Sequence, residues 1–362
     1  MKYLKAIPAL LLFGFSCVLI YSCKSYVGST KVILDVDAKP AEKISDYCFF
    51  KEVKDFSKPN PGVIPYQRIN SMFNDYSLRD NFFYIPGDKS FDVDSNNLLN
   101  LPIGSCLINI VYYFKDERNG AHGKQLIETQ LLARKQSGWE ARDYIWNEDQ
   151  TDALWSVTGD IKLITWRTKD GMERQVNFVI PSKNECKSCH WRAEHISPIG
   201  INIANLNLDV ACIAGKKNQL EQWVEVGLLK NFTISNAPKY PNWRDTTVAI
   251  ELRVRSYLDA NCAHCHNPNG PAYVSGLFLN HDNYNMAAYG ICKSPPSAGK
   301  GSCNLKYDIV PGKPGESIIV CRMAATELGI KMPQLGRTII DNDGVSLIIK
   351  WIAQLKGDCS VQ

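Results

Sequence analysis

Several sequence features that identify common classes of protein are scarce in this chain. It carries 41 Lys and Arg against 37 Asp and Glu, a formal net charge of only +4. It has no basic patch typical of a nucleic-acid-binding protein. Histidine is rare, at 6 of 362 residues. The apolar stretch near the N-terminus, residues 6–20, is too short to span a bilayer. Nucleic-acid binding and an N-terminal membrane-spanning helix are therefore not expected.

Cysteine, by contrast, is plentiful, and four of the 13 cysteines belong to two copies of one motif. The copies are Cys186-Lys-Ser-Cys189-His190 and Cys262-Ala-His-Cys265-His266. Cys-x-x-Cys-His is the attachment motif of c-type haem: the thiols add to the porphyrin vinyl groups, and the histidine binds the iron. With this composition chance gives roughly 0.01 copies. The sequence thus predicts two covalently bound haem c groups, with His190 and His266 as proximal iron ligands.

Haem is joined to this motif outside the cytoplasm, and the N-terminus fits export. Lys2 and Lys5 precede the apolar stretch, and Ile20-Tyr-Ser-Cys23 resembles a bacterial lipobox. We therefore expect residues 1–22 to be a lipoprotein signal peptide and Cys23 to be lipidated after cleavage. An ordinary signal peptide or an uncleaved anchor is the alternative. The expected location is the bacterial cell envelope, as a periplasmic or surface-exposed lipoprotein held to the membrane by its lipid.

An odd number of cysteines remains in the exported chain: Cys48, Cys106, Cys212, Cys292, Cys303, Cys321 and Cys359. An oxidising compartment favours disulfides among them, and at least one must stay free or pair outside the chain. Cys292 and Cys303 flank a loop rich in Pro, Gly and Ser, and we expect them to pair.

Residue patterns divide the exported chain into four parts. Residues 23–60 hold few apolar runs and are expected to form a tether and an entry segment. Residues 61–181 are expected to form a β-rich domain, because β-branched and aromatic runs at 107–114, 126–133, 161–167 and 176–180 alternate with turn signals. Residues 182–244 carry the first motif, and residues 245–362 carry the second.

Two helical patterns surround the second motif. Apolar residues at 250, 254, 257 and 258 recur at the spacing of one helix face just before Cys262. Asp341-Asn-Asp-Gly supplies N-capping residues for a last helix with apolar residues at 348, 351, 352 and 355. Two such helices, packed together, match the plan of c-type cytochromes. The predicted fold class is α+β multidomain, with a β-rich N-terminal domain followed by a mainly α-helical, cytochrome c-like region that carries both haems.

The distal ligands differ between the two predicted haems. For the second haem we expect Met332, which lies between the second motif and the C-terminal helix, and Met323 and Met286 are alternatives. His264, inside the second motif, should point away from its own iron and is interpreted as a supporting or surface residue.

No methionine lies in the 72 residues between Cys189 and Cys262, so the distal ligand of the first haem stays unknown. His195 is too near His190 to reach the other side of the ring easily, and His122 and Met172 are more simply surface residues. A first haem with an open coordination position therefore remains an alternative.

The chain resembles an uncharacterised family of diheme c-type cytochromes, often lipoproteins, with a β-rich N-terminal region and two Cys-x-x-Cys-His motifs. The resemblance covers about residues 44–355. Besides the two haem motifs it includes Gly62-Val-Ile-Pro-Tyr66, Phe73-Asn-Asp-Tyr76, Pro198-Ile-Gly200, Tyr307-Asp-Ile-Val-Pro-Gly312 and Met332-Pro-Gln-Leu-Gly336. Small departures at Asn74, Gln130 and Glu185 touch no expected haem ligand. The resemblance implies an exported two-haem protein and brings no known substrate.

These patterns favour a membrane-tethered diheme c-type cytochrome that transfers electrons between redox partner proteins, rather than an enzyme. One alternative is a peroxidase-like haem enzyme that uses an open first haem, with Glu185, Glu194 or His195 near it. Another is a haem-bearing accessory or binding subunit, whose aromatic platform would comprise Trp139, Tyr144, Trp146 and Trp155. Zinc is the weakest interpretation of the Cys-x-x-Cys pairs, because it leaves the histidine after each pair unexplained.

Overall fold

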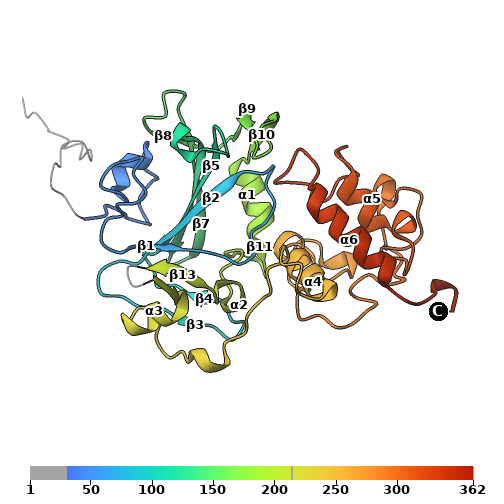
Figure 1. Cartoon of the computed structure of the whole chain (residues 1–362). Coiled ribbons are helices and arrows are strands. Elements are labelled where there is room, and N and C mark those ends of the chain that lie inside the picture. The colour runs from blue at the N-terminus through green and yellow to red at the C-terminus, as the bar shows by residue number, and fades with distance from the viewer. Residues whose placement is uncertain (1–30, 213–214, 362) are drawn as a thin grey trace, which may run out of the picture.

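The computed structural model describes residues 31–212 and 215–361, which form a lobe built on a sheet and a C-terminal lobe of short helices (Figure 1). The central sheet has six antiparallel strands in the order β1-β2-β5-β6-β7-β8. They are β1 (Val63–Tyr66), β2 (Leu78–Tyr84), β5 (Cys106–Phe114), β6 (Lys124–Lys135), β7 (Gly138–Trp146) and β8 (Ala153–Ser156). Side chains of successive residues alternate between the two faces of such a sheet, so each strand serves both faces.

One face of the sheet is covered by the N-terminal segment of the described chain. Val32, Val36, Tyr47 and Phe49 are buried there against strand residues such as Ile108. Residues 32–60, expected from the sequence to be a tether and entry segment, therefore complete a hydrophobic core of the sheet lobe.

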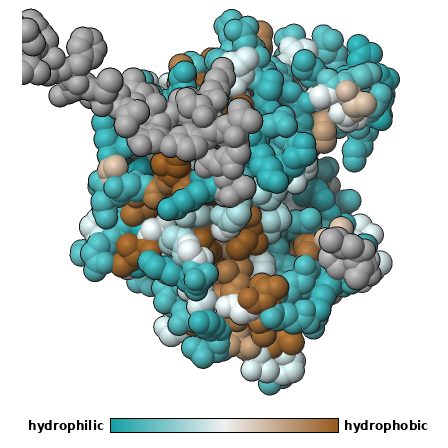
Figure 2. All heavy atoms as spheres, turned by 90° about the vertical axis from the view of Figure 1, so that its left-hand side faces the viewer, coloured by the Kyte–Doolittle hydropathy of each residue, from teal (hydrophilic) through white to brown (hydrophobic). Residues whose placement is uncertain are grey.

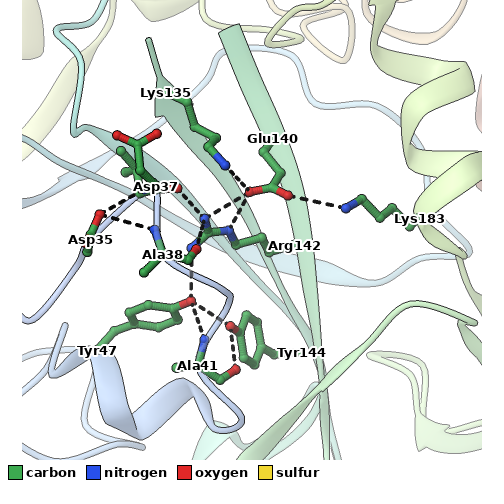
Figure 3. Close-up of polar contacts among 11 residues, drawn as sticks. Asp35, Asp37, Ala38, Ala41, Tyr47, Lys135, Glu140, Arg142, Tyr144 and Lys183 are labelled. Carbon is green, nitrogen blue, oxygen red and sulfur yellow. Dashed lines mark hydrogen bonds and ion pairs between the residues drawn. The ribbon is translucent and has the colours of Figure 1, made fainter. Parts of the chain in front are cut away.

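A polar network fastens this segment to the sheet (Figure 3). The Arg142 side chain, only 1% exposed, donates to the backbone oxygen of Val36 at 2.6 Å and to Tyr47 Oη at 3.3 Å. Its guanidinium also pairs with Glu140 at 2.9 Å, and Glu140 in turn contacts Lys183, the first residue of a helix, at 3.3 Å. Arg142 thus links the N-terminal segment to the sheet, and Glu140 links the sheet to that helix.

The opposite face carries two separate hydrophobic clusters. At one end, Phe83 and Leu107 pack against Trp223 from α3 (Gln219–Glu225). At the other end, Tyr113 packs against Trp166 and Phe178 of a hairpin formed by β9 (Asp160–Arg167) and β10 (Glu173–Ile180). Between the clusters the same face presents polar side chains from β5, β6 and β7, and these line a cavity described below.

The expectation of a mainly α-helical, cytochrome c-like region after residue 181 is wrong. The chain is β-rich and only 22% helical. Short two-stranded pairs interrupt the part after residue 181: β11 (Trp191–Arg192) with β12 (His195–Ile196), and β13 (Asp209–Cys212) with β14 (Gly215–Asn218). A further small pair, β3 (Asp92–Val93) with β4 (Leu99–Asn100), lies earlier in the chain. Gly, Pro and Asn residues are frequent between the helices, and most of this part lies in turns and loops.

The described α-helices are correspondingly short. They are α1 (Lys183–His190), α2 (Ile203–Leu206), α3, α4 (Ile250–Asn261), α5 (Ile318–Ala324) and α6 (Asn342–Gln354). The packing of α4 on α6 that the apolar spacing predicted is confirmed, and both contribute to one buried cluster. Asp341 caps α6 by accepting from Gly344 N at 3.1 Å, and it also accepts from Tyr257 Oη of α4 at 3.0 Å.

Two disulfides fix the loops of the C-terminal lobe, Cys292–Cys359 and Cys303–Cys321. The expected Cys292–Cys303 pair is therefore wrong. Cys303 follows a 3-10 turn that packs on α5, so that Cys321 of α5 is its neighbour, while Cys292 faces the chain end. Cys48 is also disulfide-bonded, and Cys106 is a buried free thiol.

The two lobes are joined by polar contacts as well as by the chain. The Asp75 carboxylate accepts hydrogen bonds from Thr338 N and Oγ1 and from Ile339 N, at 2.8 to 3.1 Å. Phe73 N donates to Asn261 Oδ1 at the end of α4 at 2.7 Å. In Figure 1 helix α1 lies between the sheet and the C-terminal lobe. The first motif is thereby placed at the junction of the lobes.

The side of the molecule in Figure 2 is mostly hydrophilic, with hydrophobic patches between polar side chains. Of the helices in the described ranges, none is long and apolar enough to cross a membrane.

Candidate functional site

The first motif sits on α1, whose start is fixed by a capping box. Ser182 Oγ accepts from Glu185 N, and the Glu185 carboxylate accepts from Ser182 N at 2.8 Å. Cys186 and Cys189 are three residues apart and so project from the same side of the helix. Glu185, considered from sequence as a catalytic group, is engaged as a helix cap.

His190 ends α1 with its ring already oriented. Its Nδ1 lies 2.8 Å from the backbone oxygen of Ser197, which makes Nδ1 the protonated nitrogen and leaves Nε2 free. Burial lowers the pKa of His190, so that the ring is neutral at physiological pH. A neutral imidazole held through Nδ1 by a backbone carbonyl is the usual preparation of a histidine for binding a metal through Nε2.

Cys186, Cys189 and His190 line a cavity of about 670 Å³ between the sheet, α1 and the start of the second motif. Its volume lies in the range of cofactor-binding pockets. The sheet contributes Leu107, Asn109, Gln130, Leu132 and Asp143, and the C-terminal lobe contributes Asp259, Ala263, His264 and His281. Arg68 and Arg79 complete the wall on the side of β2.

The two arginines bring positive charge to the wall of the cavity. Arg68 Nε and Arg79 Nε are buried and have no hydrogen-bond partner, although Arg68 donates through Nη2 to Asn81 Oδ1 at 2.6 Å. Burial, and then the charge of Arg68, lower the pKa of Arg79 to about 10. Guanidinium groups bind carboxylates through paired hydrogen bonds. The pair therefore suits a ligand that carries carboxylates, as the propionates of haem do.

A pair of buried carboxyl groups lies beside Cys186 on the sheet. Burial raises the pKa of Glu128, and burial together with the charge of Glu128 raises the pKa of Asp143 well above its ordinary value. Glu128 accepts from Gln130 Nε2 at 3.0 Å, and Asp143 Oδ1 accepts from Tyr144 N at 2.9 Å. Glu128 Oε2 and Asp143 Oδ2 are buried and have no hydrogen-bond partner among the described residues. Burial and the charge of Glu128 therefore favour the protonated form of Asp143, which could donate its proton to Glu128.

The second motif follows α4 directly and forms one more helical turn. His266 N donates to Cys262 O at 2.9 Å, and Ser275 Oγ lies 3.3 Å from His266 Nδ1. Burial, together with the nearby charges of Arg322 and Lys293, lowers the pKa of His266 to about 4. Burial also raises the pKa of Cys262 and of Cys265 to about 12, so both thiols are protonated. Because its pKa is lowered, His266 is neutral at physiological pH, as His190 is.

The structure places the two motifs next to each other, although 71 residues separate them in sequence. Ala193 N, just after the first motif, donates at 3.0 Å to the backbone oxygen of Asn269, just after the second. Cys189 is near enough to Cys265 to raise its pKa, after the larger effect of burial. Burial, together with the smaller effects of His190 and His266, lowers the pKa of His264 to about 4.

Met332, the expected distal ligand at the second motif, is half-buried between α5 and α6. Its backbone N donates to Arg322 O at 2.9 Å, and the charge of Arg322 also acts on His266. Met332 and His266 thus lie in the same part of the C-terminal lobe. Ligation of the second haem by Met332 stays a prediction. The alternative Met323 is buried in the α4–α6 core, and Met286 is 48% exposed.

Other residues singled out from the sequence lie away from the cavity. His122, Met172, Glu194 and His195 are exposed. The four aromatic residues considered as a binding platform do not form one, because Tyr144 and Trp146 are fully buried in the core of the sheet lobe. Cys23 and the predicted signal peptide lie outside the described residues.

The residues at both motifs fit haem c. Their four cysteines are free, whereas Cys48, Cys292, Cys303, Cys321 and Cys359 are oxidised. Within residues 31–212 and 215–361 no group of three or more His, Cys, Asp or Glu is arranged to hold a bare metal ion, as structural zinc requires. Sequence reasoning missed Arg68, Arg79, Glu128 and Asp143. In the sequence, the only indication of these residues is a charged side chain within or next to a segment that otherwise resembles a strand.

No protein-family model matches the chain, and neither a search of curated proteins nor one of solved structures finds a match.

Proposed function

We propose that the protein is an exported diheme c-type cytochrome that transfers electrons between redox partners. The observation that carries the proposal is the juxtaposition of the two Cys-x-x-Cys-His motifs, joined by the Ala193–Asn269 hydrogen bond beside a cavity of about 670 Å³. Each haem, when bound, supplies one-electron chemistry at its iron. Adjacent sites favour transfer between the two, because such transfer slows steeply with distance.

The chain's own residues would hold both groups in place. Cys186 and Cys189 would fix one haem and Cys262 and Cys265 the other as thioethers. Ser197 O holds the ring of His190, and Ser275 Oγ lies beside Nδ1 of His266. Arg68 and Arg79 would pair with the propionates of the first haem. The Asp75 contacts to Thr338 keep the two lobes, and hence the two motifs, in a fixed relation.

The proposed location in the cell envelope rests on the N-terminal sequence. A signal peptide over residues 1–22 would deliver the chain to the compartment in which haem c is attached. Lipidation of Cys23 would tether it to the membrane. The disulfides of the C-terminal lobe support an oxidising compartment.

A second candidate function is peroxidase-like chemistry at the first haem. One observation favours it: the buried carboxyl pair Glu128 and Asp143 lies near Cys186, and burial in the cavity wall favours the protonated form of Asp143. A proton donor of this kind is what acid–base catalysis at a haem needs. It requires in addition an open coordination position at that haem.

The test is to count haems and to follow their redox behaviour after expression with a c-type haem maturation system. Mass spectrometry under denaturing conditions and the pyridine haemochrome spectrum should show two covalent haems. Cys186→Ala with Cys189→Ala should remove one of them, whereas Cys106→Ala, a free thiol outside both motifs, should leave both. Redox titration should then show two reversible one-electron steps. Protein without covalent haem, or rapid turnover of peroxide, would contradict electron transfer as the function.

A further inference from the structure

The cavity at the first motif contains a histidine from the second motif. His264 lines the cavity together with Cys186, Cys189 and His190. The sequence alone places it far from the first motif, 74 residues after His190 along the chain, and suggests only a supporting or surface role. The structure instead puts an imidazole from the C-terminal lobe into the space where the first haem would be held.

The local backbone explains the direction of this side chain. Cys262 to His266 form a helical turn, shown by the bond from His266 N to Cys262 O at 2.9 Å. Residues two apart on such a turn project to opposite sides, because each step rotates the direction by about 100°. If His266 faces the second haem, His264 must therefore face away from it. The first motif lies on that side, because His264 lines the same cavity as Cys186, Cys189 and His190.

The His264 imidazole also lacks any partner of its own. Its Nδ1 is buried, and neither ring nitrogen hydrogen-bonds to another described residue. Buried polar atoms in proteins almost always have a partner. His190, which lines the same cavity, has its Nδ1 used by Ser197 and its Nε2 free. Two imidazole rings, each with a nitrogen that has no described partner, thus line one cavity.

We propose that His264 is the second axial ligand of the haem held by Cys186, Cys189 and His190. The first haem then has two histidine ligands and no open position. This inference rests on the proposed attachment of haem to the first motif, and it deepens the proposed electron transfer. His264 and Cys265 are neighbours in the chain. A short path through these two residues would therefore connect the iron of the first haem to the thioether bond of the second haem.

His281 is the competing ligand within the cavity. Its Nε2 is also buried without a partner. Its ring, however, stacks on Tyr240 with 4.2 Å between ring centroids, and its backbone N is held by Asp259 Oδ1 at 3.0 Å. His264 has no such aromatic contact among the described residues. The His281 ring is therefore already positioned against the cavity wall, and it provides the matched control.

The experiment compares the purified wild-type protein with His264→Ala and His281→Ala. Haem content is measured first, by mass and by the haemochrome spectrum, and should be two in all three proteins. Electron paramagnetic resonance of the oxidised proteins and carbon monoxide binding to the reduced proteins are then recorded. Wild type and His281→Ala should show low-spin first haem and no binding of carbon monoxide there. His264→Ala should convert half of the total haem to a high-spin form that binds carbon monoxide.

Added imidazole should return the His264→Ala spectrum to low spin, which a general disturbance of folding would not allow. If wild type has two haems but half of them are already high-spin and bind carbon monoxide, the ligand assignment is wrong while the two-haem proposal stands. The same holds if His281→Ala, and not His264→Ala, opens the site. Wild type without covalent haem overturns the two-haem proposal and the ligand assignment together. Should His264→Ala fail to accumulate, the wild-type spectra alone still decide whether the first haem is open.

Discussion

Ala193 N lies 3.0 Å from the backbone oxygen of Asn269, and this hydrogen bond joins the segments that follow the two Cys-x-x-Cys-His motifs. Ala193 and Glu194 form the two-residue turn between β11 and β12, with φ of 46° and 65°. Side chains with a Cβ disfavour these left-handed angles. The contact between the motifs is therefore made by a turn that contains two conformationally strained residues.

Glu194→Gly should stabilise the protein, because glycine adopts this backbone conformation without steric penalty. Glu194 is exposed, so that little else is lost. We expect a gain of about 0.5–1 kcal/mol in the free energy of unfolding, measured by urea denaturation. Glu194→Ala is the control, and it should give no gain, because alanine keeps the Cβ. An equal gain in both variants would show that side-chain charge, and not backbone strain, is responsible.

Asp143→Asn should stabilise the protein at alkaline pH. Its pKa is raised in the folded state, so the folded protein binds this proton more tightly than the unfolded chain. Stability then falls as pH rises from the ordinary carboxyl range through the raised pKa. Asparagine is neutral throughout, keeps Oδ1 for Tyr144 N, and can donate to Glu128 as the protonated acid does.

Urea denaturation at pH 5 and pH 8 measures this effect. The stability of the variant relative to the wild type should be greater at pH 8 than at pH 5 by about 1–3 kcal/mol, the usual penalty for an unpaired buried charge. Asp149→Asn, in an exposed turn, should show no such pH dependence. A variant less stable than the wild type at both pH values would rule out the shared proton.

Arg142→Met should destabilise the sheet lobe, because it removes the donor to Val36 O and Tyr47 Oη at a site that excludes water. We expect a loss of about 2–4 kcal/mol. Limited proteolysis should also cleave residues 31–60 faster. Lys135→Met removes another partner of Glu140, at 3.5 Å, and should lose less than about 1 kcal/mol because that pair is partly exposed. Equal losses would mean that the charge balance of Glu140, and not the bonds to the N-terminal segment, matters.

The strands that were predicted and those that were missed differ in a simple physical respect. β5 is an almost continuous run of β-branched and aromatic residues, because both of its faces are buried, and the sequence predicts it within one residue. β2 and β7 carry charged residues such as Arg79, Arg142 and Asp143 in their interiors. These side chains are buried at a cavity or under the N-terminal segment. They therefore break the alternation of apolar and polar residues by which a strand is recognised.

The candidate site shows the same division between local and long-range information. The two haem motifs are contiguous in sequence, so their residues and spacing are evident directly. The arginine and carboxyl groups around the first motif lie between 43 residues (Asp143) and 118 residues (Arg68) before Cys186 in the chain. Arg68 follows β1 and the other three lie on strands, so the pairing of the strands of the central sheet brings them together. The sequence identifies His264 as a residue of the second motif. Its direction follows from helical geometry, but the cavity it enters depends on how the two lobes dock.

Cys23→Ala should release the protein from the membrane fraction, because it removes the predicted site of lipidation. Fractionation followed by detergent phase separation measures the change, and the haem content of the released protein should be unchanged. Cys17→Ala, within the predicted signal peptide, is the control and should leave the protein in the membrane fraction. Persistence of the Cys23→Ala protein in that fraction would favour an uncleaved N-terminal anchor.

Met332→His should lower the reduction potential of the second haem, because an imidazole ligand stabilises the oxidised iron more than a thioether does. Potentiometric titration should show one of the two steps shifted to a more negative potential and the other unchanged. Met323→Leu is the control: its side chain is buried in the α4–α6 core, so stability should fall by less than about 1.5 kcal/mol without a change in either potential. If Met323→Leu shifts a potential and Met332→His does not, the methionine ligand has been assigned to the wrong residue. If both steps move together in Met332→His, the two haems are so strongly coupled that the titration reports the pair. In that case the ligand change must be read from the spectrum of each haem.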